Sequence, residues 1–92
     1  PVTLNRPLSI DNDAVELSWL PSQENDFANY RVYRSEQASV SINNPPIWMN
    51  SSKSMNKFKD TGLRSGKTYY YKVVVYDKGG LFAESNEISV NK

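Results

Sequence analysis

The sequence predicts an all-β fold, a two-sheet antiparallel sandwich of seven strands that forms one domain over residues 1–92. Three observations support this fold class. No window has the apolar spacing of an amphipathic helix. Short β-rich runs alternate with turn residues at the intervals typical of a sandwich. A chain of 92 residues that is 38% hydrophobic can build one core but is too short for a second.

Two strands are expected before residue 20. Residues 3–10 form the first, and Pro7 is compatible with it only if this strand lies at a sheet edge, because proline donates no ladder hydrogen bond. Residues 11–13 form a turn. Residues 15–19 then alternate strictly, so Val15, Leu17 and Trp19 share one face.

The third strand is expected at residues 30–35, after a polar connection at 22–29. Its alternation divides four large side chains between the two faces. Tyr30 and Val32 point to one face, and Arg31 and Tyr33 to the other.

Residues 36–57 contain few strand signals. The sequence Asn-Asn-Pro-Pro at 43–46 breaks regular structure, and a brief strand is expected at 47–49. A loop rich in Ser, Asn and Lys follows. A very short strand at 57–59 then ends at the turn residues 60–62.

The longest strand signal is YYYKVVVY at residues 69–76, which is bulky on both faces. A hairpin-type loop follows at 77–80. Residues 87–90 close the domain, with Ile88 and Val90 facing the core.

Four stretches resemble a fibronectin type III domain: AVELSW at 14–19, NDFANYRVYRS at 25–35, FKDTGLRSGKTYYYKVVVYDKGG at 58–80 and AESNEISV at 83–90. Only residues 36–57 have no counterpart in the family pattern. The resemblance implies an immunoglobulin-like sandwich with the family's topology, in which the third and sixth strands are neighbours. It also implies a module excised from a larger bacterial protein.

The resemblance further implies a tyrosine corner before the sixth strand. Tyr69 would bury its ring and hydrogen-bond its hydroxyl to backbone a few residues upstream. Leu63 would fill the core beneath it, and Gly66 would take the positive φ that the turn needs. The expected core and corner residues are Trp19, Tyr30, Val32, Phe58, Leu63, Gly66, Tyr69, Tyr71 and Val73.

An inward Tyr69 places every second residue of 69–76 on the outer face, namely Tyr70, Lys72, Val74 and Tyr76. Arg31 and Tyr33 would lie beside this set, and Trp48 would extend it if Ile47 faces the core. The candidate binding face is therefore Arg31, Tyr33, Trp48, Tyr70, Lys72 and Tyr76. These side chains either stabilise the sheet as cross-strand pairs or bind a partner, since Tyr, Trp and Arg are enriched in interface hot spots. A sugar stacked on the rings is a variant of the second interpretation.

Composition excludes several chemistries. The chain has no Cys and no His, which removes disulfides, thiolate nucleophiles, Cys/His zinc sites and triads with an imidazole base. The acidic turns at 11–13 and 24–26 lack the spacing of a calcium loop. We expect no catalytic residue, cofactor or metal. A net charge of +1 with scattered Lys and Arg argues against nucleic acid, and no apolar run is long enough to insert into a membrane.

These observations predict a non-catalytic module that spaces or orients neighbouring domains in an extracellular, periplasmic or cell-surface protein. By analogy with related bacterial modules, that protein would be a polysaccharide-active enzyme. The alternative is a recognition module that binds a protein or glycan through the Tyr/Trp/Arg face. Asn50-Ser51-Ser52 also fits the N-glycosylation pattern. No Arg-Gly-Asp motif is present, so integrin binding is not expected.

Overall fold

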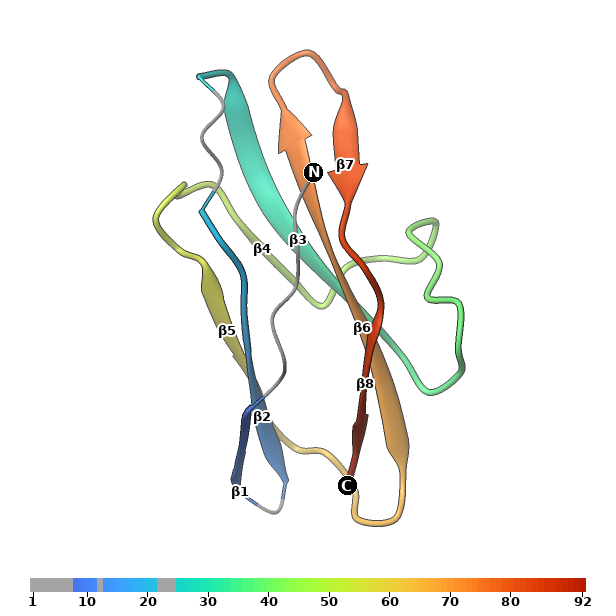
Figure 1. Ribbon diagram of the computed structural model, residues 1–92. Helices are drawn as coiled ribbons and strands as arrows, with labels where there is room; N and C mark the ends of the chain where they lie inside the picture. The colour runs from blue at the N-terminus through green and yellow to red at the C-terminus, as the bar shows by residue number, and fades with distance from the viewer. Residues whose placement is uncertain (1–7, 12, 22–24) are drawn as a thin grey trace.

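A computed structural model describes residues 8–11, 13–21 and 25–92 and shows two antiparallel sheets facing each other (Figure 1). The three-stranded sheet has the order β1-β2-β5. The five-stranded sheet has the order β4-β3-β6-β7, and β8 also pairs with β6. The strands are β1 (Leu8–Asp11), β2 (Ala14–Ser18), β3 (Phe27–Ser35), β4 (Trp48–Asn50), β5 (Lys57–Asp60), β6 (Thr68–Asp77), β7 (Phe82–Glu84) and β8 (Ile88–Asn91).

The last strand of the predicted sandwich is interrupted. β7 pairs with Val74–Tyr76 and β8 pairs with Thr68–Tyr71, so both lie along the same edge of β6. Counted as one broken strand, they make the seven strands that the sequence predicts. Ser85 maintains the interruption, because its Oγ accepts a hydrogen bond from the Val73 N–H at 2.9 Å and its own N–H donates to the Val73 carbonyl at 2.8 Å.

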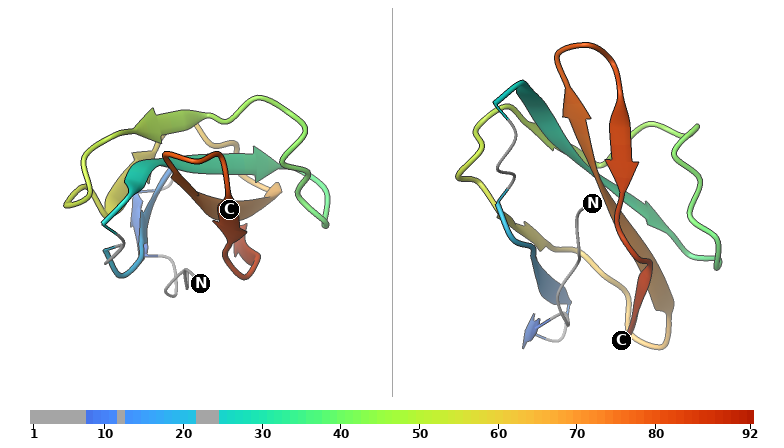
Figure 2. Two further views of the ribbon diagram at one scale, coloured as in Figure 1. Left: turned by 90° about the horizontal axis from the view of Figure 1, so that it is seen from above. Right: turned by 45° about the horizontal axis from the view of Figure 1, so that its top comes forward.

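The core lies between the two layers, which are seen from above in the left view of Figure 2. Trp19 is at its centre and is buried. Its ring meets Tyr30 and Trp48 edge-on, at centroid distances of 5.4 and 6.0 Å. The buried residues of the core are Val15, Leu17, Trp19, Phe27, Tyr30, Val32, Leu63, Tyr69, Tyr71, Val73 and Val90, with Phe58 packed against them.

β3 begins at Phe27, three residues earlier than expected. Its pairing with β6 shifts register between Phe27 and Asn29. Because of this irregularity, Phe27 and Tyr30 both face the core although their spacing is odd, and their rings lie 4.7 Å apart. A local register shift of this kind has no signature in residue alternation. Residues 3–7 of the first expected strand lie outside the described residues.

The tyrosine corner has the geometry that the resemblance implies. The Tyr69 hydroxyl accepts a hydrogen bond from the Arg64 N–H at 2.8 Å. Leu63 is buried beneath it. Gly66 adopts a φ of 83°, a conformation that L-residues rarely adopt.

A buried polar cluster joins the two sheets. Asp60 ends β5, and its carboxylate accepts a hydrogen bond from the Tyr71 hydroxyl at 2.6 Å. Arg34 of β3 pairs with the same carboxylate at 2.9 Å. Burial and this hydrogen bond to Asp60 raise the pKa of Tyr71 above its ordinary value. Asp60, which the sequence predicts only as a turn residue, is buried, and its side chain links the layers.

Candidate functional site

The outer face of the five-stranded sheet, which carries the candidate binding residues, is covered at one end. Tyr33 and Val74 are 2% and 0% exposed there. Val40, from the irregular segment between β3 and β4, clusters with both, and Ile42, Tyr70 and Tyr76 pack beside them. The expectation that Tyr33 and Val74 lie on an open face is therefore wrong, because a loop without strand periodicity folds over them. Burial raises the pKa of Tyr33.

Trp48 lies on the opposite side of the sheet from the candidate face. In the β3–β4 ladder it pairs with Val32, and directly opposed residues share a face. Val32 belongs to the core, so Trp48 does too, and its ring stacks on Phe58 at 5.2 Å. Ile47 does not face the core but is exposed. The prediction that Trp48 extends the outer face is wrong for this reason, and Met49 takes that place.

The open part of the face is one row of side chains across four strands, which we name the aromatic stripe: Met49, Arg31, Tyr76 and Phe82. Met49 and Arg31 are cross-strand partners, as are Tyr76 and Phe82. The Arg31 guanidinium lies over the Tyr76 ring at 4.0 Å, and the Tyr76 and Phe82 rings are 5.4 Å apart. Met49 is 56% and Phe82 50% exposed. The stripe thus presents apolar surface with one cation stacked on it.

Two other predicted members of the face lie on β6, on the far side of Val74 from the stripe. Lys72 pairs with Glu84 of β7 at 3.2 Å. Tyr70 is half-buried and packs against the covered cluster. The six predicted residues therefore divide: Arg31 and Tyr76 belong to the stripe, Lys72 lies on the outer face beyond Val74, Tyr33 and Tyr70 lie in or beside the cluster, and Trp48 lies in the core. Tyr76 also packs against the cluster, so the stripe adjoins it.

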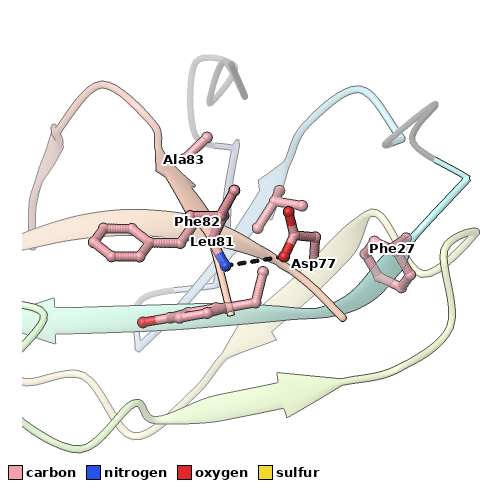
Figure 3. Close-up of a pocket in the computed structure, with 7 residues that line it drawn as sticks. Phe27, Asp77, Leu81, Phe82 and Ala83 are labelled. Carbon is pink, nitrogen blue, oxygen red and sulfur yellow. Dashed lines mark hydrogen bonds between the residues drawn. The ribbon is translucent and has the colours of Figure 1, made fainter. Parts of the chain in front are cut away.

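A pocket of about 210 Å³ adjoins the stripe at the turn between β6 and β7 (Figure 3). Phe27, Leu81, Phe82 and Ala83 contribute to its walls. Asp77 shapes the turn, because its Oδ1 accepts hydrogen bonds from the N–H groups of Gly79 and Leu81, each at 2.9 Å. The pocket walls are largely apolar, and the Leu81 side chain is exposed.

Met49, Leu81 and Phe82 were not among the residues predicted for the face. Phe82 had a usable signal, since a loop over 77–81 places it opposite Tyr76. Met49 had no such signal, because β4 has only three residues. The face to which each of its side chains points depends on how β4 pairs with β3. Within the described ranges no group of three or more acidic, His or Cys side chains could hold a metal ion. No helix in that part of the chain is long and apolar enough to cross a membrane.

The sequence also raised two other candidate sites, the N-glycosylation pattern at Asn50 and the acidic turns. Asn50 ends β4, and its Oδ1 accepts a hydrogen bond from the Ser52 N–H at 2.7 Å, a local turn contact. The acidic turns at 11–13 and 24–26 each include a residue outside the described ranges.

Comparison with known proteins agrees with this architecture. The family described as "Fibronectin type III domain" matches residues 3–91. An amylopullulanase of Thermoanaerobacterium saccharolyticum is 34% identical over 88 residues, which are 95% of this chain and 6% of the relative. The chain therefore spans a small fraction of that protein.

Solved structures give the same picture. A pectate lyase of Erwinia chrysanthemi, in complex with tetragalacturonic acid, aligns with a TM-score of 0.77 and 26% identity over 97% of this chain and 28% of its own. A β-1,2-glucanase of Parabacteroides distasonis aligns with a TM-score of 0.76 and 25% identity over 98% of this chain and 12% of its own. The sixth fibronectin type III domain of a human protein, at 16% identity and a TM-score of 0.75, shares the fold over 95% of this chain and 78% of its own. With its strand order, tyrosine corner and family match, the chain belongs to the fibronectin type III domain family.

Proposed function

We propose that this domain is a non-catalytic module of an extracellular, glycan-degrading bacterial enzyme, in which it spaces and orients neighbouring domains. The observation that carries the proposal is the 34% identical segment inside an amylopullulanase that is many times longer. The fold suits this role, because its described residues form an elongated body of 41 × 24 × 18 Å with one compact core. Fold alone does not establish function, so the role needs its own test.

A chimera tests the spacing role. This chain replaces the matched 88-residue segment of the amylopullulanase, and a second variant lacks the segment altogether. We expect the chimera to retain the parent rate on polymeric glucan and the deletion to lose rate on the polymer while keeping it on short oligosaccharides. Equal rates for the deletion and the parent on the polymer would contradict the proposal.

A second candidate function is recognition of a protein or glycan through the aromatic stripe. The exposure of Phe82 and Met49 beside the stacked pair of Arg31 and Tyr76 favours it. Flat rings and a guanidinium are typical of binding hot spots. The competing interpretation is that these side chains only stabilise the sheet as cross-strand pairs.

Binding by the 92-residue chain distinguishes these two interpretations. A glycan array and a retardation assay in gels that contain soluble polysaccharide compare the wild type with Phe82→Ala. Leu20→Ala is the control, since Leu20 is an apolar side chain that is even more exposed than Phe82 and lies outside the five-stranded sheet. Recognition predicts binding that Phe82→Ala weakens and Leu20→Ala does not. Absence of binding by the wild type removes glycan recognition from the proposal.

A further inference from the structure

Residues 36–42 form a segment that we name the strap. It follows β3 and begins the long connection to β4 that is drawn in green in Figure 1. Most of its side chains are exposed, but Val40 is 5% exposed and packs on Tyr33 and Val74. The strap therefore covers apolar surface of the sheet with very few side chains of its own.

One carboxylate holds the strap backbone. Glu87 Oε1 accepts a hydrogen bond from the Val40 N–H at 2.6 Å, and Oε2 accepts one from the Ser39 N–H at 3.2 Å. Ser39 has a φ of 66°, an unfavourable conformation for a residue with a Cβ. Among the described residues, the hydrogen bonds that tie the strap backbone to a distant part of the chain both go to Glu87. The other distant contact, between Glu36 and Lys67 at 2.7 Å, joins two exposed side chains and stabilises little.

Glu87 lies in the interruption of the last strand, between β7 and β8. From this position the Glu87 side chain reaches the strap, 47 residues away in sequence. Ser85 stabilises the interruption through its contacts with Val73. The segment between β7 and β8 therefore makes two contacts: Ser85 binds the edge of β6, and Glu87 binds the strap.

We propose that the strap is a latched cover: Glu87 holds it closed, and release of this carboxylate uncovers Tyr33, Val74 and the inner side of Tyr70 as a cryptic extension of the outer-face surface. The underlying β3–β6 ladder runs from Phe27 to Ser35 and does not include the strap. The strap can therefore open without breaking the sheet. Such a local opening belongs to the low-stability end of the fold.

Amide hydrogen exchange of the 92-residue chain tests the latch. In the wild type, the Val40 amide is expected to exchange by local opening, faster than the amides of Arg31 and Lys72, which belong to the β3–β6 ladder. Glu87→Ala should accelerate Val40 exchange by about tenfold or more, the usual worth of a charge-assisted hydrogen bond, and leave Arg31 and Lys72 unchanged. Glu36→Ala is the control, because it removes a strap carboxylate that binds no backbone, and it should leave Val40 unchanged.

A second readout is the pKa of Tyr33, measured by NMR on ¹³C-labelled tyrosine. Burial raises this pKa most, the hydrogen bond with Tyr76 raises it further, and Arg31 lowers it. Opening of the strap should reduce the effect of burial and so lower the pKa, while Tyr76 and Arg31, which lie outside the strap, keep their places. Glu87→Gln separates the latch from the charge, since the amide oxygen can still accept from Val40. We expect Glu87→Ala to lower the pKa of Tyr33 clearly more than Glu87→Gln.

Three results would overturn the proposal. The first is Val40 exchange that is the same in Glu87→Ala and the wild type. The second is equal acceleration of Val40, Arg31 and Lys72, which would make Glu87 a residue of global stability. The third needs no variant: wild-type Val40 that exchanges only with global unfolding would show that the strap does not open by itself.

Discussion

The Tyr71 hydroxyl of one sheet donates a hydrogen bond to the Asp60 carboxylate of the other, with 2.6 Å between the oxygens. Both residues are buried, and Arg34 completes the cluster from the neighbouring strand. The contact fixes the two layers to each other beside an otherwise apolar core. A directional bond of this kind specifies how the layers align, whereas apolar packing alone tolerates more sliding.

Replacing Asp60 by Ala should lower the free energy of unfolding by about 2 kcal/mol, because the buried Tyr71 hydroxyl and the partly exposed Arg34 lose their acceptor. Urea unfolding followed by tryptophan fluorescence measures this change. Glu84→Ala, which removes only the exposed partner of Lys72, should cost less than about 1 kcal/mol. A loss for Asp60→Ala as small as that of the control would show that the cluster stabilises nothing.

Alkaline pH should destabilise the fold through Tyr71. Burial holds the folded-state pKa of Tyr71 above the ordinary value of about 10, so the unfolded chain releases this proton first. The stabilisation is complete below about pH 10 and falls above it, by about 1.4 kcal/mol per pH unit for each such tyrosine. The measurement is the unfolding free energy at several pH values from 8 to 12.

Tyr71→Phe distinguishes the contribution of the hydrogen bond to stability at neutral pH from the effect of the raised pKa on stability at alkaline pH. The variant should be less stable than the wild type at pH 7, yet its stability should fall less steeply above pH 10, because one raised pKa has been removed. An unchanged alkaline slope would assign the pH dependence to other groups, Tyr33 among them.

Tyr69→Phe should cost about 1 kcal/mol, the usual net contribution of one buried hydrogen bond, since the Arg64 N–H loses its acceptor. Tyr70→Phe is the neighbouring control, because the described part of the chain contains no hydrogen bond from that hydroxyl. Thermal unfolding of both variants measures the difference. Equal melting temperatures would count against the corner.

Gly66→Ala should destabilise by about 1 kcal/mol, because a Cβ disfavours the φ of 83° although the space around it is open. Gly79 offers a matched comparison in another loop. Its added Cβ would meet Asp77 Oδ1 at an ordinary 3.4 Å, and its φ is not positive. Gly79→Ala should change stability by less than about 0.5 kcal/mol. A similar cost at both positions would contradict the conformational explanation.

The fold class and the facing of the long strands follow from the residue pattern alone. Alternation in 69–76 correctly separates buried Tyr71 and Val73 from outward Lys72 and Tyr76, because a period of two is a local property of extended backbone. The same holds for Tyr30 and Arg31 in β3. It does not hold for Phe27, where a register irregularity interrupts the period.

The exposure of the outward residues does not follow from that pattern. Which outward residues are buried depends on contacts between distant segments: Tyr33 and Tyr76 both point outward, yet Tyr33 is buried in the cluster with Val40 of the strap, whereas Tyr76 packs at its border and stays partly exposed in the aromatic stripe. The strap has no periodicity, and its position depends on Glu87, 47 residues from Val40. The facing of Trp48 likewise depends on its pairing with Val32. The burial of an outward side chain by a loop and the pairing register of a short strand both depend on contacts between distant segments. The residue pattern along one strand therefore cannot predict them.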